Sequence, residues 1–182
     1  MWVFGYGSLT WNVDFPYEDR CVGYVEGFAR RFWQGSIDHR GVPDAPGRVV
    51  TLVPDEKEHI WGIAYKLAEH QVAEVMSHLD HREKCGYETR EMLFHPKDTL
   101  LQPFQVTAYS ASSDNPWYLG PAPLEDMATE IATRCGPSGR NAEYLLKLAE
   151  SMRSIAPHHH DDHLYTLEEK VKRILCLNDD DD

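Results

Sequence analysis

The chain opens with Met1-Trp2-Val3-Phe4-Gly5-Tyr6-Gly7-Ser8-Leu9, in which an apolar stretch runs directly into two glycines. The apolar part predicts a short strand over residues 2–6. Glycines let the backbone turn sharply and approach a ligand closely. Successive N–H groups in such a turn can form a nest for a carboxylate or phosphate. From these residues alone, a ligand-binding turn and a plain strand-end turn both remain open.

Two other motifs are excluded at this turn. A dinucleotide-binding GxGxxG needs a third glycine where Thr10 stands. A hydrolase GxSxG needs a glycine at Tyr6, two residues before Ser8. Ser8 is therefore expected to form hydrogen bonds rather than to act as a nucleophile.

Strand patterns fill the first half of the chain and helical patterns fill the second. The β-rich runs after the first strand cover residues 49–53, 60–67, 89–94 and 104–110, and the polar segment 54–59 predicts a hairpin. Helical periodicity covers residues 71–84, 124–134, 141–155 and 163–177. This order predicts an α+β fold, with a small barrel or strongly curled sheet flanked by helices. We expect one domain over residues 1–177, followed by an acidic tail over 178–182.

Composition limits the class of protein and its partners. The 182 residues carry a net charge of −12, which argues against nucleic acid as a partner. No stretch approaches the roughly 20 apolar residues that a membrane span needs, and the first residues do not resemble a signal peptide. The four cysteines are far apart, which argues against a zinc or CxxC motif. We therefore expect a cytosolic (cytoplasmic) protein with reduced thiols.

Glu83 stands at the end of an apolar stripe on the predicted helix 71–84. It lies eleven residues after Val72, which at about 100° per residue places it only about 20° away around the helix. Glu74 falls on the opposite face. A carboxylate that faces a low-dielectric pocket has a raised pKa and can act as a base near neutral pH. The alternative is a helix-end acid that bends into water or pairs with Arg82 or Lys84.

Two further segments, both rich in glycine and proline, are candidates for binding a ligand. Residues 30–52 are predicted to form a long loop with four arginines, and long ordered loops often serve as lids or binding loops. Residues 115–123 place Tyr118 on a rigid connection, where its hydroxyl could donate to a substrate. A surface loop with screened charges and a core tyrosine with a satisfied hydroxyl are the respective alternatives.

The run His158-His159-His160-Asp161-Asp162-His163 raises the hypothesis of a metal site. Consecutive histidines point in different directions on any regular backbone, whereas zinc needs converging ligands. We therefore favour a polar loop between helices over a zinc site.

Together these segments resemble the ChaC family of glutathione-specific γ-glutamylcyclotransferases, and most of all its shorter, type-two form. The resemblance is carried, in family order, by residues 4–9, 30–52, 61–65, 82–84 with 86–87, 115–126 and 136–144. It spans about residues 1–175. The chain departs from the pattern mildly, with Cys85 where the family often has glycine.

The resemblance implies a fold, a reaction and a site. The fold is a small mixed or antiparallel β-barrel flanked by helices. The reaction is that of a lyase that converts reduced glutathione to 5-oxo-L-proline and L-cysteinylglycine, with no metal and no cofactor, in a monomer or homodimer. Glu83 is the implied general acid and base. The implied substrate-binding residues are Val3, Phe4, Gly5, Tyr6, Gly7, Ser8, Leu9, Arg40 and Tyr118.

Three alternatives remain open. The enzyme could act on other γ-glutamyl compounds, such as γ-glutamyl amino acids or γ-glutamylamines. A non-catalytic protein could keep the same pocket as a glutathione sensor. A metal-binding module built on the histidines is the third.

Overall fold

A computed structural model describes residues 1–83 and 86–179, and it divides into two compact units. The first unit comprises Met1–Ala29 and Leu52–Pro116, and the second comprises Arg30–Thr51 and Trp117–Asp182. The single domain expected over residues 1–177 stays a prediction. In the described part of the chain, every helix is too short or too polar to cross a lipid bilayer.

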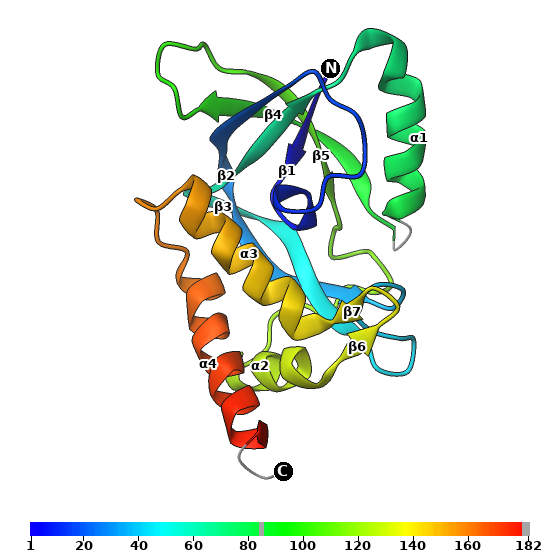
Figure 1. Cartoon of the computed structure of the whole chain (residues 1–182), viewed down its shortest axis with the longest axis vertical. Helices are drawn as coiled ribbons and strands as arrows, with labels where there is room; N and C mark the ends of the chain where they lie inside the picture. Colours follow the sequence, from blue (N-terminus) through cyan, green and yellow to red (C-terminus); the bar gives the residue numbers. More distant parts are fainter. Residues whose placement is uncertain (84–85, 180–182) are drawn as a thin grey trace. The chain divides into compact units, whose positions relative to one another are not determined.

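Five strands close into a barrel in the order β1-β3-β2-β4-β5 (Figure 1). Their bounds are β1 Trp2–Gly5, β2 Asp19–Ser36, β3 Gly47–Lys66, β4 Glu88–Pro96 and β5 Phe104–Ser110. β1 pairs antiparallel with β3 and parallel with β5, so the barrel is mixed. The predicted α+β fold with a small mixed barrel is confirmed.

Alternating apolar side chains fill the barrel within the first unit, as expected for strands with one buried face. Phe94 is fully buried and its ring lies 5.6 Å from that of Phe4 in an edge-on arrangement. Val3, Phe4 and Val106 are at most 1% exposed. The helix of this unit, α1 (Val72–Arg82), buries Val75 and Leu79 and leaves Glu74 exposed, as its periodicity predicts.

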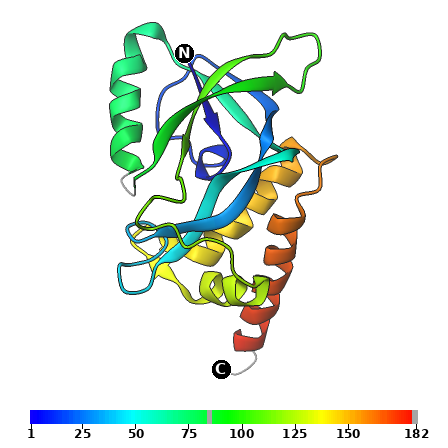
Figure 2. The same ribbon diagram turned by 180° about the vertical axis from the view of Figure 1, so that it is seen from behind.

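The second unit contains three helices that pack on one another (Figures 1 and 2). These are α2 Leu124–Thr133, α3 Asn141–Ile155 and α4 Asp162–Asp179. The two short strands β6 Cys135–Gly136 and β7 Gly139–Arg140 lie between α2 and α3 in the sequence. Leu145, Leu148, Leu164 and Leu167 are fully buried and form much of the helical core.

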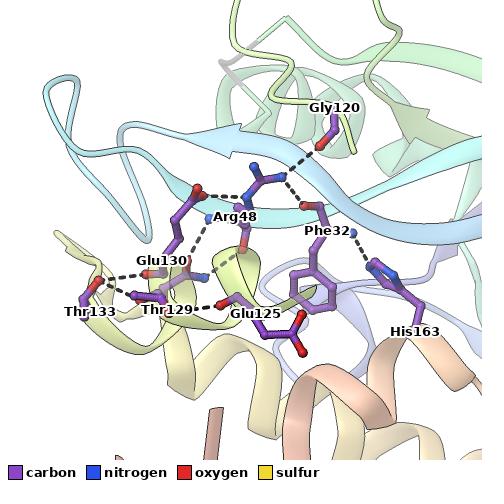
Figure 3. A network of polar contacts seen from close by, with 9 residues as sticks. Phe32, Arg48, Gly120, Glu125, Thr129, Glu130, Thr133 and His163 are labelled. Carbon is purple, nitrogen blue, oxygen red and sulfur yellow. Dashed lines mark hydrogen bonds and ion pairs between the residues drawn. The ribbon is translucent and has the colours of Figure 1, made fainter. Parts of the chain in front are cut away.

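Arg48 is the polar centre of the second unit (Figure 3). Its side chain is 5% exposed, and its Nε donates to Glu130 Oε2 at 2.6 Å. Its Nη1 donates to the carbonyl oxygens of Phe32 and Gly120 at 3.0 and 2.9 Å. The Asn141 amide exchanges two hydrogen bonds with the Arg48 backbone. A buried guanidinium is tolerated here because carboxylate and carbonyl oxygens satisfy its donors.

The predicted hairpin over residues 54–59 is wrong, because β3 runs through it as one strand. Pro54 and Asp55 are typical turn residues, yet here they lie in an extended segment. Neighbouring strands, β1 and β2, pair with β3 on its two sides. This pairing outweighs the local turn preference.

The long loop predicted over residues 30–52 is shorter than expected. Residues 30–36 belong to β2, and β3 begins at Gly47, two residues before the predicted β-rich run 49–53, which is confirmed. Strand β2 escaped prediction because Glu26 and Gly27 interrupt its apolar pattern. Gly27 has a φ of 83°, a conformation that glycine adopts without strain, so it marks a local irregularity inside the strand.

The predicted helix ends differ little from the observed ones. α3 matches its predicted bounds, whereas α1 ends at Arg82 rather than at residue 84. α4 continues to Asp179, so the first two residues of the predicted acidic tail are helical. Residues 180–182 of that tail and the Cys85 position lie outside the described residues.

Candidate active site

The turn after β1 presents two accessible residues between buried ones. Gly7 and Ser8 are partly exposed, while Tyr6 and Leu9 are buried. Gly5 is required here, since a Cβ on it would lie 2.6 Å from the Leu9 Cβ. The short helix η1 (Ser8–Thr10) then begins, and its first intrahelical donor is Thr10 N–H, which bonds Gly7 O at 3.0 Å.

The N–H groups of Ser8 and Leu9 precede that first donor, so they have no partner within the helix. They sit beside the partly exposed Ser8 hydroxyl. This arrangement of backbone donors and a hydroxyl matches what a small anion such as a carboxylate needs.

Glu83 lies at the C-terminal end of α1, where it caps the helix. Its N–H donates to Leu79 O at 2.9 Å, and its side chain is partly buried. Because α1 ends at Arg82, the position of Glu83 is set by the helix cap rather than by continued helical periodicity. The predicted roles of Glu83 and of the turn remain predictions.

Tyr109 on β5 connects the end of α1 to the turn. Its hydroxyl donates to Asp80 Oδ1 at 2.6 Å, and its carbonyl accepts the Tyr6 hydroxyl at 2.6 Å. Burial first, then the hydrogen bond and charge of Asp80, and last the charge of Glu83 raise the pKa of Tyr109 far above its usual value. Tyr109 therefore stays a protonated donor, and the Glu83 carboxylate lies close enough to affect it.

Arg82 links α1 to the turn on another side. Its Nη2 donates to Ser8 Oγ at 2.8 Å, and its Nη1 donates to Asp14 Oδ1 at 2.6 Å. Asp14 also pairs with His78 Nε2 at 3.0 Å. Partial burial raises the pKa of Asp14, but the hydrogen bond from His78 and the charge of Arg82 together hold it below its usual value.

Not all of the implied substrate-binding side chains are free for a ligand. Val3, Phe4, Tyr6 and Leu9 place their side chains in the core, and the Val3 and Phe4 backbone lies in β1, which pairs with β3 and β5. Gly5, Gly7 and Ser8 form the turn itself. The first unit thus brings this turn together with Arg82, the residue directly before Glu83.

The other two implied residues belong to the second unit. Arg40 Nη1 donates to Arg140 O at 3.0 Å and pairs with Glu143 at 3.2 Å. Tyr118 forms a β-bridge with Gln34, and burial raises the pKa of its hydroxyl.

Sequence reasoning missed Asp80, Arg82 and Tyr109 as site residues. Asp80 and Arg82 carried a usable signal, since both flank the apolar stripe that ends near Glu83. Tyr109 carried none, because its contacts with Asp80 and Tyr6 join residues 29 and 103 positions apart.

The histidine run divides between loop and helix, as the loop hypothesis largely expects. His158 to His160 precede α4, whereas His163 lies in the first turn of α4. His163 Nε2 accepts the Phe32 N–H at 3.0 Å. Burial, followed by the charge of Arg31, lowers the pKa of His163 to about 4.

We expect acid to destabilise the fold through His163. Its folded pKa lies below the usual 6.5, so its contribution is complete above pH 6.5 and is lost as the pH falls toward 4. Linkage predicts a loss of about 2 kcal/mol between pH 7.5 and 5 from this group. Urea unfolding at both pH values should show a smaller loss in His163→Gln, whose amide oxygen can still accept the Phe32 N–H. Equal losses in both proteins would contradict this assignment.

The geometry defines a small α+β barrel protein with a tight turn after β1 and an acidic residue, Glu83, at the end of α1, and its similarity to known proteins identifies its family. A family model described as ChaC-like protein matches residues 1–174. Glutathione-specific gamma-glutamylcyclotransferase 1 of Rattus norvegicus is 48% identical over 177 residues, which cover 96% of this chain and 80% of that protein. Gamma-glutamylcyclotransferase 2-3 of Arabidopsis thaliana is 42% identical over 187 residues, which cover 99% and 92%.

A solved structure agrees with these relatives. A crystal structure of the yeast γ-glutamyl cyclotransferase specific to glutathione superposes with a TM-score of 0.88 at 30% identity. The match covers 95% of this chain and 96% of the yeast chain. The chain belongs to the ChaC family.

Proposed function

We propose that this protein is a glutathione-specific γ-glutamylcyclotransferase, a lyase that releases 5-oxo-L-proline and L-cysteinylglycine and so contributes to glutathione degradation in the cytosol. Relatives that are 47–48% identical over 96% of the chain carry this activity in their names. The single observation that carries the proposal is the hydrogen bond from Arg82, the residue directly before Glu83, to Ser8 in the turn after β1.

The substrate supplies its own nucleophile. The α-amine of the γ-glutamyl group attacks the γ-carbonyl carbon, a C–N bond forms and closes a five-membered ring, and the amide bond to cysteine breaks. No water is consumed and no electrons are transferred. The nitrogen of cysteinylglycine leaves with the bonding pair and needs a proton.

The protein must therefore move protons and hold the substrate folded. An α-amine with a pKa near 8 is mostly protonated at neutral pH, so a base must remove one proton before attack. Glu83 takes that proton and delivers it to the departing amine, which makes one carboxylate sufficient for both transfers.

The turn after β1 holds the far end of the substrate. The N–H groups of Ser8 and Leu9 and the Ser8 hydroxyl bind the α-carboxylate of the γ-glutamyl group. The backbone from Val3 to Gly7 lines the γ-glutamyl end of the substrate. Fixing this end brings the amine and the γ-carbonyl together and supplies the proximity contribution to the rate. Arg40 and Tyr118 are proposed to contact the remainder of the substrate.

Product analysis after incubation with reduced glutathione tests the proposal. We expect equal amounts of 5-oxoproline and cysteinylglycine, and far slower turnover of γ-glutamylalanine. Comparable rates on γ-glutamylalanine would indicate a broader γ-glutamyl cyclotransferase. Binding of glutathione without any product would indicate a sensor and would contradict the proposal.

A further inference from the structure

Arg82 lies beside the proposed site, but it takes no part in the proton transfers or in the substrate contacts proposed above. It is the last residue of α1, directly before Glu83. Its side chain is 13% exposed, and its two terminal nitrogens bond different partners on the segment that follows β1. Nη2 donates to Ser8 Oγ, and Nη1 donates to the Asp14 carboxylate and to Asn12 O, at 2.8, 2.6 and 3.4 Å.

The hydrogen bond from Arg82 determines whether the Ser8 hydroxyl acts as a donor or as an acceptor in a further contact. A guanidinium has only donors, whereas a serine hydroxyl has one proton to donate and two lone pairs to accept. Ser8 Oγ must therefore be the acceptor in this contact. One lone pair is used, and the hydroxyl proton is left for a different partner. A positively charged donor behind the oxygen also strengthens the hydroxyl as a donor.

Asp14 fixes the guanidinium from the other side. It accepts from Arg82 and from His78, and both interactions favour its ionised form. The helix C-terminus carries a partial negative charge that favours a cation in the last turn. Asp14 thus holds Arg82 in one orientation, with its Nη2 directed at Ser8 Oγ.

We infer that Arg82 is a positioning residue that makes the Ser8 hydroxyl select substrates bearing an α-carboxylate; this rests on the proposed function. A carboxylate that accepts from Ser8 at about 2.7 Å lies within about 5.5 Å of Arg82 Nη2, given the 2.8 Å Arg82–Ser8 contact. At that range an opposite charge favours the ionised carboxylate. A ligand that lacks the carboxylate gains nothing from either group.

A purely structural role for Arg82 predicts something different. If the Arg82–Asp14 pair only secured the helix end, its loss would weaken binding of every ligand alike or would lower the melting temperature. The inference instead predicts a change in the preference between two ligands. The preference is therefore the quantity to measure.

The test compares glutathione with 4-aminobutyryl-cysteinylglycine, which lacks only the α-carboxylate. The KM of glutathione and the competitive inhibition constant (Ki) of the analogue are measured for wild type, Arg82→Gln and Arg82→Lys. In wild type we expect Ki to exceed KM by about 30-fold or more, since charged hydrogen bonds typically contribute a 10- to 100-fold effect. In Arg82→Gln the ratio of Ki to KM should fall to roughly 3, because the KM of glutathione rises while the Ki of the analogue is unaltered. Arg82→Lys, which keeps the charge, should retain an intermediate ratio.

Ser8→Ala and Arg20→Gln complete the design. Adding Arg82→Gln to Ser8→Ala should lower the ratio little further, because the two residues act through one hydroxyl. Arg20 is exposed at the start of β2, and Arg20→Gln should leave the ratio unchanged. A ratio that is unaltered in Arg82→Gln, or near 1 in wild type, would overturn the inference while 5-oxoproline release persists. A wild-type protein that releases no 5-oxoproline would instead refute the proposed function and, with it, this inference.

Discussion

Replacing Glu83 by glutamine is expected to lower the rate of 5-oxoproline formation by about 10³-fold. General acid–base catalysis typically contributes 10² to 10⁴ to a rate, and here one carboxylate performs both proton transfers. Glutamine keeps the shape of the side chain, but its amide neither accepts nor releases a proton near neutral pH. The rate is measured as 5-oxoproline released at saturating glutathione.

The fold and substrate binding should survive this change. The Glu83 side chain is partly exposed, and the helix cap uses its backbone N–H rather than its carboxylate. The variant should therefore melt within a few degrees of wild type and bind glutathione with similar affinity. Glu58→Gln is the matched control, since Glu58 is an exposed acid on β3 and its loss should leave the rate unaltered. Turnover retained within about tenfold in Glu83→Gln would remove Glu83 from the mechanism.

The second large effect is on stability, in Arg48→Met. Methionine fills much of the same volume but leaves the carbonyl oxygens of Phe32 and Gly120 without their donor and Glu130 without its charge partner. Breaking a buried pair by removing one partner typically costs 3–5 kcal/mol. For a chain of this size, we expect the melting temperature to fall by about 10 °C or more. Thermal unfolding monitored by circular dichroism measures the shift.

Arg173→Ala is the contrasting variant for this stability prediction. Arg173 pairs with Glu169 one turn away, and both side chains are about two-thirds exposed or more. Exposed pairs of this kind contribute little, so its melting temperature should change by no more than about 2 °C. Similar shifts in the two arginine variants would show that the buried network of Figure 3 does not anchor the second unit.

Elements with a clear local signal were predictable from the sequence. β5 and α3 match their predicted bounds, because apolar periodicity and flanking residues agree at both ends. β2 was missed because Arg30 and Arg31, like Glu26 and Gly27 earlier in the strand, interrupt its apolar pattern. Arg30 is 1% exposed and pairs with Asp161, 131 residues away, so only the tertiary fold explains why it is buried.

The candidate site was likewise predictable only where the sequence carries a local signal. Periodicity drew attention to Glu83, and the two glycines drew attention to the turn before Ser8. The Arg82–Ser8 bond was not predictable, because it joins residues 74 positions apart and depends on where the helix ends. α1 ends at Arg82, directly before Glu83, and this helix end places the Arg82 side chain toward the turn after β1. Local pattern therefore indicates candidate groups, while the contacts that orient them require the folded chain.

The central claim is that the substrate amine, and not water, attacks the γ-carbonyl. Running the reaction on glutathione in ¹⁸O-labelled water tests this most directly, with mass spectrometry of the 5-oxoproline and of any glutamate formed. The account predicts 5-oxoproline without ¹⁸O and no glutamate, because both oxygens of the α-carboxylate and the ring carbonyl oxygen come from the substrate. Labelled glutamate, or 5-oxoproline that carries ¹⁸O, would show attack by water and would contradict the account.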